Sequence, residues 1–358
     1  MGRWRSRLLG LAVGLGVLVA LEGGLRVGLG PPPPPVQVYR ALGEQDSWLE
    51  ARSDGLWPTY QLDARLVPHD TEVVVLGGSS VRGGTPGLWR RGEFPGVAGE
   101  RLKRPVANLG SPGLDTHDHV QVLDALLKAD ALPELSTVVV YAGHNDFGNA
   151  RFQARYGTVS AGLAAHLQSG LERLVLYTRL SRLLRPVRGT VREVGVGRQQ
   201  GALTEAAWGA VLRDLERNLD RLVWQTDKAG LQLVLMAPMS DLSMPPVDPA
   251  CTADRCPSKD FERGRSTADV AALRRARDTD FIALRSPSHV GELMSTMADE
   301  NNHVDAIVVE ERVPWEDDLA VPSRVLFFDP VHPSAEGHRV LGDLLANHLG
   351  PASGERPR

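Results

Sequence analysis

The chain has 358 residues, 42% of them hydrophobic, which is enough for a sizeable core and exceeds one average domain. Lys and Arg (40) nearly balance Asp and Glu (44), and the formal net charge is -4. This balance argues against a nucleic-acid binder, as does the lack of a basic block interleaved with aromatic residues. We expect one large α/β domain with appended segments.

The N-terminus has the pattern of an export signal. Three arginines between positions 3 and 7 precede an uncharged apolar run from 8 to 21, and such a positive flank stays in the cytoplasm. The run alone is short for a membrane span, but the nearest small-x-small cleavage site, 28–30, is followed by an unfavourable Pro31. We therefore expect residues 1–30 to be an uncleaved single-pass membrane helix, with secretion after signal-peptide cleavage as the alternative. Either way the main domain lies outside the cytoplasm, on the periplasmic side.

The segments that follow differ in composition. Glu22 and Arg26, four residues apart, can pair at the membrane interface. Five consecutive prolines from Pro31 form a stiff extended spacer, and the stretch after them has no clear period. We expect this division of the chain: a spacer and lead-in at 31–70, the main domain at 71–350, and a disordered tail at 351–358.

A buried strand and a glycine-serine turn begin the main domain. Val73–Leu76 is a continuous apolar run, typical of a strand buried on both faces of a parallel sheet, and it ends in Gly77-Gly78-Ser79-Ser80. Open α/β folds bind ligands at this edge of the sheet. The spacing fits no dinucleotide loop, phosphate loop or G-x-S-x-G elbow. Ser79 is thus either a nucleophile or a turn residue, and Ser80 is the alternative nucleophile.

Two further strand ends bring polar groups to the same edge. A helix at 88–103, interrupted near Pro95, separates the first strand from a second, which leads into Asn108-Leu109-Gly110-Ser111-Pro112-Gly113. A third apolar run, from 138, ends in Gly143-His144-Asn145-Asp146. The Gly113 N–H and the Asn145 amide are donors of the kind that stabilise an oxyanion. Taken singly, Gly113 is better explained as a plain turn and Asn145 as a helix cap.

A helix capped by Asp115 or Thr116 contains His117 and His119, two residue types that could suggest a metal-binding site. Because residues two apart on a helix point to different faces, these histidines cannot converge on one ion. We expect a solvated helix start, no metal and no cofactor. Residues 152–200 form an insertion without a motif, and a basic-faced helix over the core is favoured there over a lid or a contact to anionic headgroups.

The second half of the chain continues the alternation of helices and strands. A helix opens at Thr204 and ends at Gly230, and an arginine-rich helical stretch with a solvated face is expected at 265–280. Cys251 and Cys256 are the two cysteines, and outside the cytoplasm a local disulfide between them is favoured over a zinc site. The remaining expected elements are strands at 231–236 and 306–309 and helices at 289–301 and 334–348.

The last motif is Asp329-Pro330-Val331-His332-Pro333. An Asp three residues before a His in a proline-bracketed turn lets the carboxylate orient the imidazole. A nucleophilic serine needs such an oriented base, because a free hydroxyl is a weak nucleophile. Five strand-like runs separated by helices imply right-handed crossovers and a three-layer α/β/α sandwich around a parallel sheet.

With these four blocks in order, the chain resembles the SGNH (GDSL-type) serine hydrolase superfamily from about Glu72 to Gly350. The resemblance implies a flavodoxin-like fold with a central five-stranded parallel sheet. It further implies Ser79 as nucleophile, His332 as base and Asp329 as its orienter. The Ser79 N–H, the Gly113 N–H and the Asn145 side chain would form the oxyanion hole. Gly78 stands where the common G-D-S motif has Asp, which bears on substrate class more than on activity.

We therefore expect a membrane-tethered serine esterase acting on a small molecule, a lipid or an acylated glycan. One alternative keeps the chemistry but changes the acceptor, as in an O-acyltransferase or deacetylase acting on an envelope polysaccharide. Another is a catalytically silent binding module on the same fold, against which the presence of all five candidate residues argues.

Overall fold

The computed structural model describes most of the main domain and the N-terminal helix. The described residues are 2–29, 36–40, 47–51, 65–82, 92–130, 132–152, 174–176, 203–247, 251–252, 255–281, 285–313 and 325–350.

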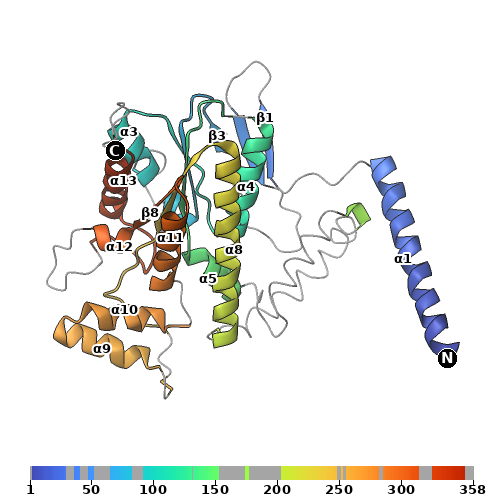
Figure 1. Ribbon diagram of the computed structural model, residues 1–358. Helices are drawn as coiled ribbons and strands as arrows, with labels where there is room; N and C mark the ends of the chain where they lie inside the picture. Colours follow the sequence, from blue (N-terminus) through green and yellow to red (C-terminus); the bar gives the residue numbers. More distant parts are fainter. Residues whose placement is uncertain are drawn as a thin grey trace.

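A five-stranded parallel sheet forms the centre of the domain (Figure 1). Its strand order, β5-β4-β6-β7-β8, is the 2-1-3-4-5 order of flavodoxin-like folds. The expected fold class is therefore confirmed, with the last strand starting two residues before its expected position. The strands are β4 (Val73–Gly77), β5 (Val106–Asn108), β6 (Thr137–Tyr141), β7 (Gln232–Ala237) and β8 (Val304–Val308).

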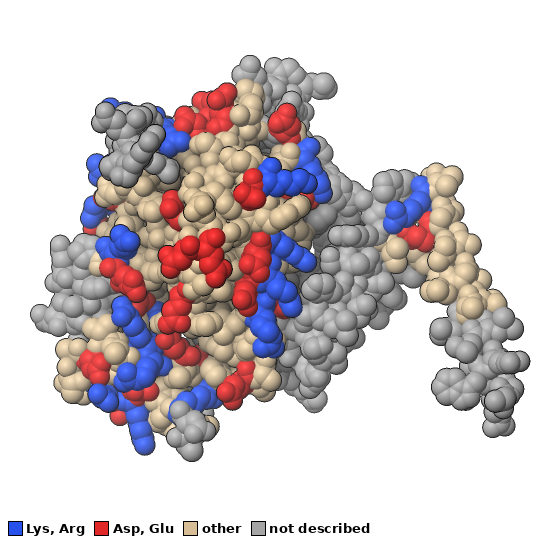
Figure 2. All heavy atoms as spheres, viewed as in Figure 1, with Lys and Arg blue, Asp and Glu red and all other residues tan. Residues whose placement is uncertain are grey.

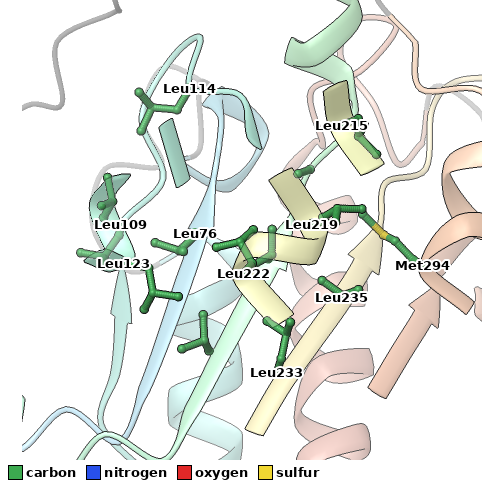
Figure 3. Packing of buried hydrophobic residues seen from close by; sticks show 14 of the residues in the cluster. Leu76, Leu109, Leu114, Leu123, Leu215, Leu219, Leu222, Leu233, Leu235 and Met294 are labelled. Atoms are coloured by element: carbon green, nitrogen blue, oxygen red, sulfur yellow. The ribbon is translucent and has the colours of Figure 1, made fainter. Parts of the chain in front are cut away.

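Successive side chains of the central strands enter two separate cores, because a strand's side chains alternate between its faces. In β4, Val74 and Leu76 belong to one core, and Val73 and Val75 to the other. All five residues of β4 are buried, which explains the continuous apolar run. Figure 3 shows the first core, where side chains such as Leu76 meet Leu222 across the space between sheet and helices.

Helices cover both faces of the sheet and complete three layers (Figure 1). The ends of α8 follow the expected signals: the Thr204 hydroxyl accepts from the Ala207 N–H, and Gly230 ends the helix at φ +68°. The first core receives side chains from α4 (Thr116–Ala129), α5 (His144–Phe152), α8 (Glu205–Ala229) and α11 (Ser288–Glu300). The second receives them from α3 (Phe94–Leu102), α12 (Val309–Arg312) and α13 (Ala335–Leu349).

One expectation for the first part of the domain needs correction, and the lead-in before it has a structure that was not expected. Pro95 does not interrupt a helix; it lies in the first turn of α3, where its missing N–H costs no hydrogen bond. The lead-in, which showed no period, contains a three-stranded antiparallel sheet of β1 (Val36–Arg40), β2 (Ser47–Ala51) and β3 (Arg65–Val67). Short strands separated by long connections leave too little pattern to recognise.

The N-terminal helix α1 (Gly2–Leu29) stands apart from the layers in Figure 1. Its segment Ala12–Leu29 is long and apolar enough to cross a membrane and is not buried against the domain, which fits an anchor or a signal sequence. The Glu22 carboxylate accepts from Arg26 Nε at 2.7 Å, as expected, and also from the backbone N–H groups of Val175 and Leu176. Within the 152–200 insertion the structure describes Phe152, at the end of α5, and residues 174–176; the others lie outside the described residues.

The expected arginine-rich helix is two helices, α9 (Pro257–Thr267) and α10 (Val270–Asp278). Arg277, placed on a solvated face by the sequence, is instead buried and paired with buried Glu310. Burying a charge requires such a partner, and the partner is too distant in sequence to foresee. Cys251 and Cys256, just before α9, are joined by a disulfide. Elsewhere, basic and acidic side chains are interspersed on the face of the domain seen in Figure 2.

Candidate active site

The first component of the site is the turn between β4 and the short helix α2 (Ser79–Arg82). Other atoms approach both glycines at this strand end closely. A Cβ on Gly77 would overlap the Val81 side chain, and a Cβ on Gly78 would overlap the amide nitrogen of Asn145. The turn therefore carries Ser79 at the sheet edge with the Asn145 amide directly against the preceding residue.

The loop before α13 places an imidazole against this serine. His332 Nε2 lies 2.7 Å from Ser79 Oγ, and His332 Nδ1 lies 2.6 Å from Asp329 Oδ2. Because the carboxylate can only accept, it holds the proton on Nδ1 and leaves Nε2 to accept from the Ser79 hydroxyl. The structure thus brings together the three side chains that the sequence singled out, across 253 positions.

The Asp329 carboxylate is held in its ionised form by its surroundings. Partial burial favours the neutral acid, but hydrogen bonds outweigh it and lower the pKa of Asp329 below its usual value. The donors are the His332 ring and the backbone N–H groups of Val331 (2.9 Å) and His332 (2.8 Å). An ionised Asp329 can both fix the tautomer of His332 and stabilise its protonated form.

Ser80, the alternative nucleophile, has a different position. It is buried and donates its hydroxyl hydrogen to the Val331 carbonyl at 3.0 Å. A backbone bond from the Asp241 N–H to the Pro330 carbonyl, also 3.0 Å, fastens the same loop to the segment after β7. These two bonds attach the His332 loop to two strand ends. The ring of half-exposed Phe328 stacks on His332, with centroids 5.4 Å apart.

Gly113 lies in a turn beside the end of β4. The sequence Ser111-Pro112-Gly113-Leu114, the φ of +76° at Gly113 and the Leu114 N–H bond to the Ser111 carbonyl (3.2 Å) are those of a type II turn. The Ser111 N–H donates to the Gly77 carbonyl at 3.0 Å, which ties this turn to the serine strand. The turn is therefore fixed to the backbone that carries Ser79.

Three donors in this region are uncommitted. Among the residues that the structure describes, the N–H groups of Ser79 and Gly113 have no hydrogen-bond acceptor. Asn145, the second residue of α5, donates one amide hydrogen to the Leu114 carbonyl at 2.8 Å, and its other hydrogen has no acceptor in the same part of the chain. Donors held in place without a partner are what an oxyanion site requires.

Two neighbours of Asn145 have structural functions that sequence analysis did not assign. His144 accepts from the Ser286 N–H at Nδ1 (2.9 Å) and lies 3.2 Å from the Met239 carbonyl at Nε2, and burial lowers its pKa to about 3. Asp146 accepts from the Thr116 N–H and hydroxyl, and burial, aided by nearby Asp115, raises its pKa to about 7. The sequence signal that could have identified these two residues is their position directly after an apolar strand.

The expected solvated start of α4 is wrong. Asp115, Thr116, Asp118 and His119 are all buried, and two of them, Thr116 and Asp115, are bonded to Asp146 and Asn149 of α5. Asp115 caps the helix, exchanging bonds with Asp118. Within the described ranges no group of three or more His, Cys, Asp or Glu side chains is arranged to hold a metal ion.

Comparisons with known proteins give fold-level likeness at low identity. No protein-family model and no curated protein matches the chain. Among solved structures, it is similar to a member of the lipolytic protein G-D-S-L family from Veillonella parvula, with 10% identity, a TM-score of 0.39, and coverage of 78% of this chain and 97% of that one. It is also similar to a GDSL-like lipase from Bacteroides thetaiotaomicron, with 12% identity, a TM-score of 0.39, and coverage of 78% of this chain and 88% of that one. A third similar structure is a mutant acetyl-xylooligosaccharide esterase from Geobacillus, with 14% identity, a TM-score of 0.39, and coverage of 79% of this chain and 96% of that one.

At such identity and overlap, this likeness assigns neither a family nor an activity to the chain. The chemistry follows from the site itself. It combines a hydroxyl bonded to an imidazole, a carboxylate that orients the imidazole, and uncommitted donors from three segments. This set is suited to acyl transfer through a covalent intermediate.

Proposed function

We propose that the protein is a serine esterase of the SGNH (GDSL) type, tethered to the membrane by α1, with its catalytic domain on the periplasmic side. The observation that carries the proposal is the continuous hydrogen-bonded chain from Ser79 through His332 to Asp329. A surface turn has no need for a carboxylate-oriented imidazole held against a serine from the other end of the sequence. The substrates would be carboxylic esters.

In the first half of the reaction, His332 Nε2 takes the Ser79 proton as Ser79 Oγ attacks the ester carbonyl. Asp329 stabilises the imidazolium that forms. The negative charge on the former carbonyl oxygen is met by the N–H groups of Ser79 and Gly113 and by the Asn145 amide. The tetrahedral intermediate then collapses: the C–O bond to the alcohol breaks, and His332 gives its proton to the departing oxygen.

In the second half, a water molecule attacks the acyl-enzyme with His332 as the base. Collapse of the second tetrahedral intermediate releases the carboxylic acid and returns the proton to Ser79. A sugar hydroxyl in place of that water would yield a transferred acyl group. Running the reaction with and without a glycan acceptor and analysing the products distinguishes hydrolysis from transfer.

The proposal is tested with a panel of p-nitrophenyl esters sorted by acyl length and with a fluorophosphonate probe. We expect turnover of at least one ester and a probe-modified peptide that contains Ser79. The probe reacts with an activated serine regardless of which alcohol the natural substrate contains. A purified, folded chain that neither hydrolyses any ester of the panel nor reacts with the probe would contradict the proposal.

A further inference from the structure

The first two turns of α5 hold the Gly113 turn through a row of polar side chains. Asn145 Nδ2 donates to the Leu114 carbonyl (2.8 Å), and Asn149, one helical turn later, donates to the Gly113 carbonyl (2.8 Å). Asn149 Nδ2 also donates to Asp115 Oδ2 at 2.9 Å. Three consecutive residues, 113–115, are thus bonded to two amides on one face of α5.

Asn149 is suited to this task by its chemistry and its surroundings. Its side-chain amide has two hydrogens, and the two bonds to the Gly113 carbonyl and the Asp115 carboxylate use both. The residue is buried, at 5% exposure, so the lost bonds could not be replaced by bulk water. An aspartate there would have no hydrogen to donate and would place another carboxylate beside Asp115.

The bonds matter because the proposed oxyanion donors come from separate segments. Gly113 supplies its N–H from a turn, whereas Asn145 supplies its amide from α5. A donor displaced by about 1 Å can cost about 100-fold in rate. Asn149 bonds directly to the residue that carries one donor and shares a helix with the other.

We infer that Asn149 is a positioning residue that sets the distance between the Gly113 N–H and the Asn145 amide. The inference rests on the proposed function for its kinetic consequence, but the structural part can be measured without it. Asn149 does not touch the reacting atoms; it acts through Gly113.

The test compares Asn149→Leu with Asn218→Leu in the full chain. Leucine has the same number and branching of side-chain heavy atoms as asparagine but no donor. Asn218 makes a matched control, because its amide bonds the same segment at the Thr116 hydroxyl (3.2 Å) without touching the Gly113 turn. Two readouts are needed: steady-state kinetics on the best ester of the panel, and hydrogen exchange of the backbone amides between residues 109 and 116.

For Asn149→Leu we expect kcat to fall by about 10- to 100-fold with KM changed less than about twofold, because the oxyanion forms only in the transition state. Amides 109–116 should exchange faster. Asn218→Leu should change neither. If Asn149→Leu has the kcat and the exchange pattern of the unaltered protein, the inference is overturned while the esterase proposal stays intact. If the unaltered protein has no turnover, the exchange comparison alone decides: unchanged exchange in Asn149→Leu overturns the inference.

Discussion

Ser79 and Ser80 are adjacent, yet their hydroxyls are in opposite situations. The Ser79 hydroxyl faces His332 Nε2, whereas the Ser80 hydroxyl is buried and donates its hydrogen to the Val331 carbonyl. The Ser79 hydroxyl is placed within hydrogen-bond distance of the imidazole, and the Ser80 hydroxyl fastens the loop that carries this imidazole. The two serines should therefore respond differently to the same substitution.

Ser79→Ala should reduce turnover to a residual level, a loss that reaches about 10⁶-fold when a catalytic serine is removed in other hydrolases. Ser80→Ala should keep a reactive Ser79, with a loss of about 0.5–1.5 kcal/mol in the free energy of unfolding from the missing bond. Ester kinetics measure turnover, fluorophosphonate labelling measures the reactivity of Ser79, and urea unfolding measures the free energy of unfolding. Labelling that survives Ser79→Ala and disappears in Ser80→Ala would reverse this assignment.

Gly78 and Asn145 form a second pair whose effects should be linked. Asn145→Ala should lower kcat by about 10²–10³-fold, the usual cost of losing one oxyanion donor. Gly78→Ala should have a similar effect, because the added Cβ takes the place of the Asn145 amide nitrogen. That nitrogen is the end of a side chain and can move away, so the fold should survive.

A double-mutant cycle makes this prediction sharp. If Gly78→Ala acts by displacing Asn145, the double variant should be about as slow as Asn145→Ala alone. Additive losses in kcat would show that Gly78 is needed for a separate reason. Circular dichroism and thermal unfolding of each variant serve as controls for folding.

The buried carboxyl of Asp146 predicts a pH-dependent stability. Its pKa is raised from 3.8 to about 7, so between these pH values the folded protein holds a proton that the unfolded chain has released. This contribution to the free energy of unfolding is lost as pH rises through the window. Buried histidines act in the opposite direction, because burial lowers the pKa of His119 and His338 to about 4 and that of His144 to about 3.

Asp146→Asn isolates the carboxyl contribution. The asparagine oxygen can still accept from Thr116, so the stability of the variant relative to the unaltered protein should increase from pH 4 to pH 7. Urea unfolding at a series of pH values measures the difference. A stability difference that stays constant over this range would contradict the raised pKa.

At the scale of elements, the disulfide between Cys251 and Cys256 closes a short loop before α9. In exported material we expect mass spectrometry without reductant to find the two cysteines linked. The chain-entropy model gives a stabilisation of about 2 kcal/mol for a loop this short. A Cys251→Ser, Cys256→Ser variant should unfold correspondingly earlier, with its ester kinetics as the control. Two free thiols in exported protein would refute the link.

The strands of the five-stranded sheet could be predicted from sequence because their signals are local, and the candidate catalytic residues because four short motifs occur in the order of a known family. Val73–Leu76 is apolar at every position, and Asp329 lies three residues from the histidine that it orients. Parallel topology then brings strand ends to one edge. What could not be foreseen depends on distant partners, as with the burial of Arg277 beside Glu310.

The start of α4 was misjudged for the same reason. Polar residues such as Asp115 and His119 suggest water, but both are buried, and α5 provides a partner for Asp115 through Asn149. Sequence analysis noted Asn145 and overlooked Asn149, although the two are one helical turn apart. The signal that could have identified Asn149 is a second side-chain amide four residues after Asn145, on the helix that begins at the strand end.

At the scale of the whole molecule, α1 is structurally separate from the sheet. The segment Ala12–Leu29 makes no contribution to the two cores of the domain. We therefore predict that a chain lacking residues 1–35 remains in the soluble fraction with kcat for soluble esters within about twofold, whereas the full chain sediments with membranes and resists an alkaline wash. Release of the full chain by that wash would contradict the anchor.

The separation of Ser79 from His332 has a consequence for biosynthesis. The imidazole is contributed by a loop 253 positions after the hydroxyl, so, under the proposed mechanism, a nascent polypeptide would carry its nucleophile long before it carries a base. Any product that ends before Asp329 would lack both members of the proposed triad that assist Ser79. An enzyme that could attack acyl esters in the envelope would thus acquire its reactivity only once its synthesis is nearly complete.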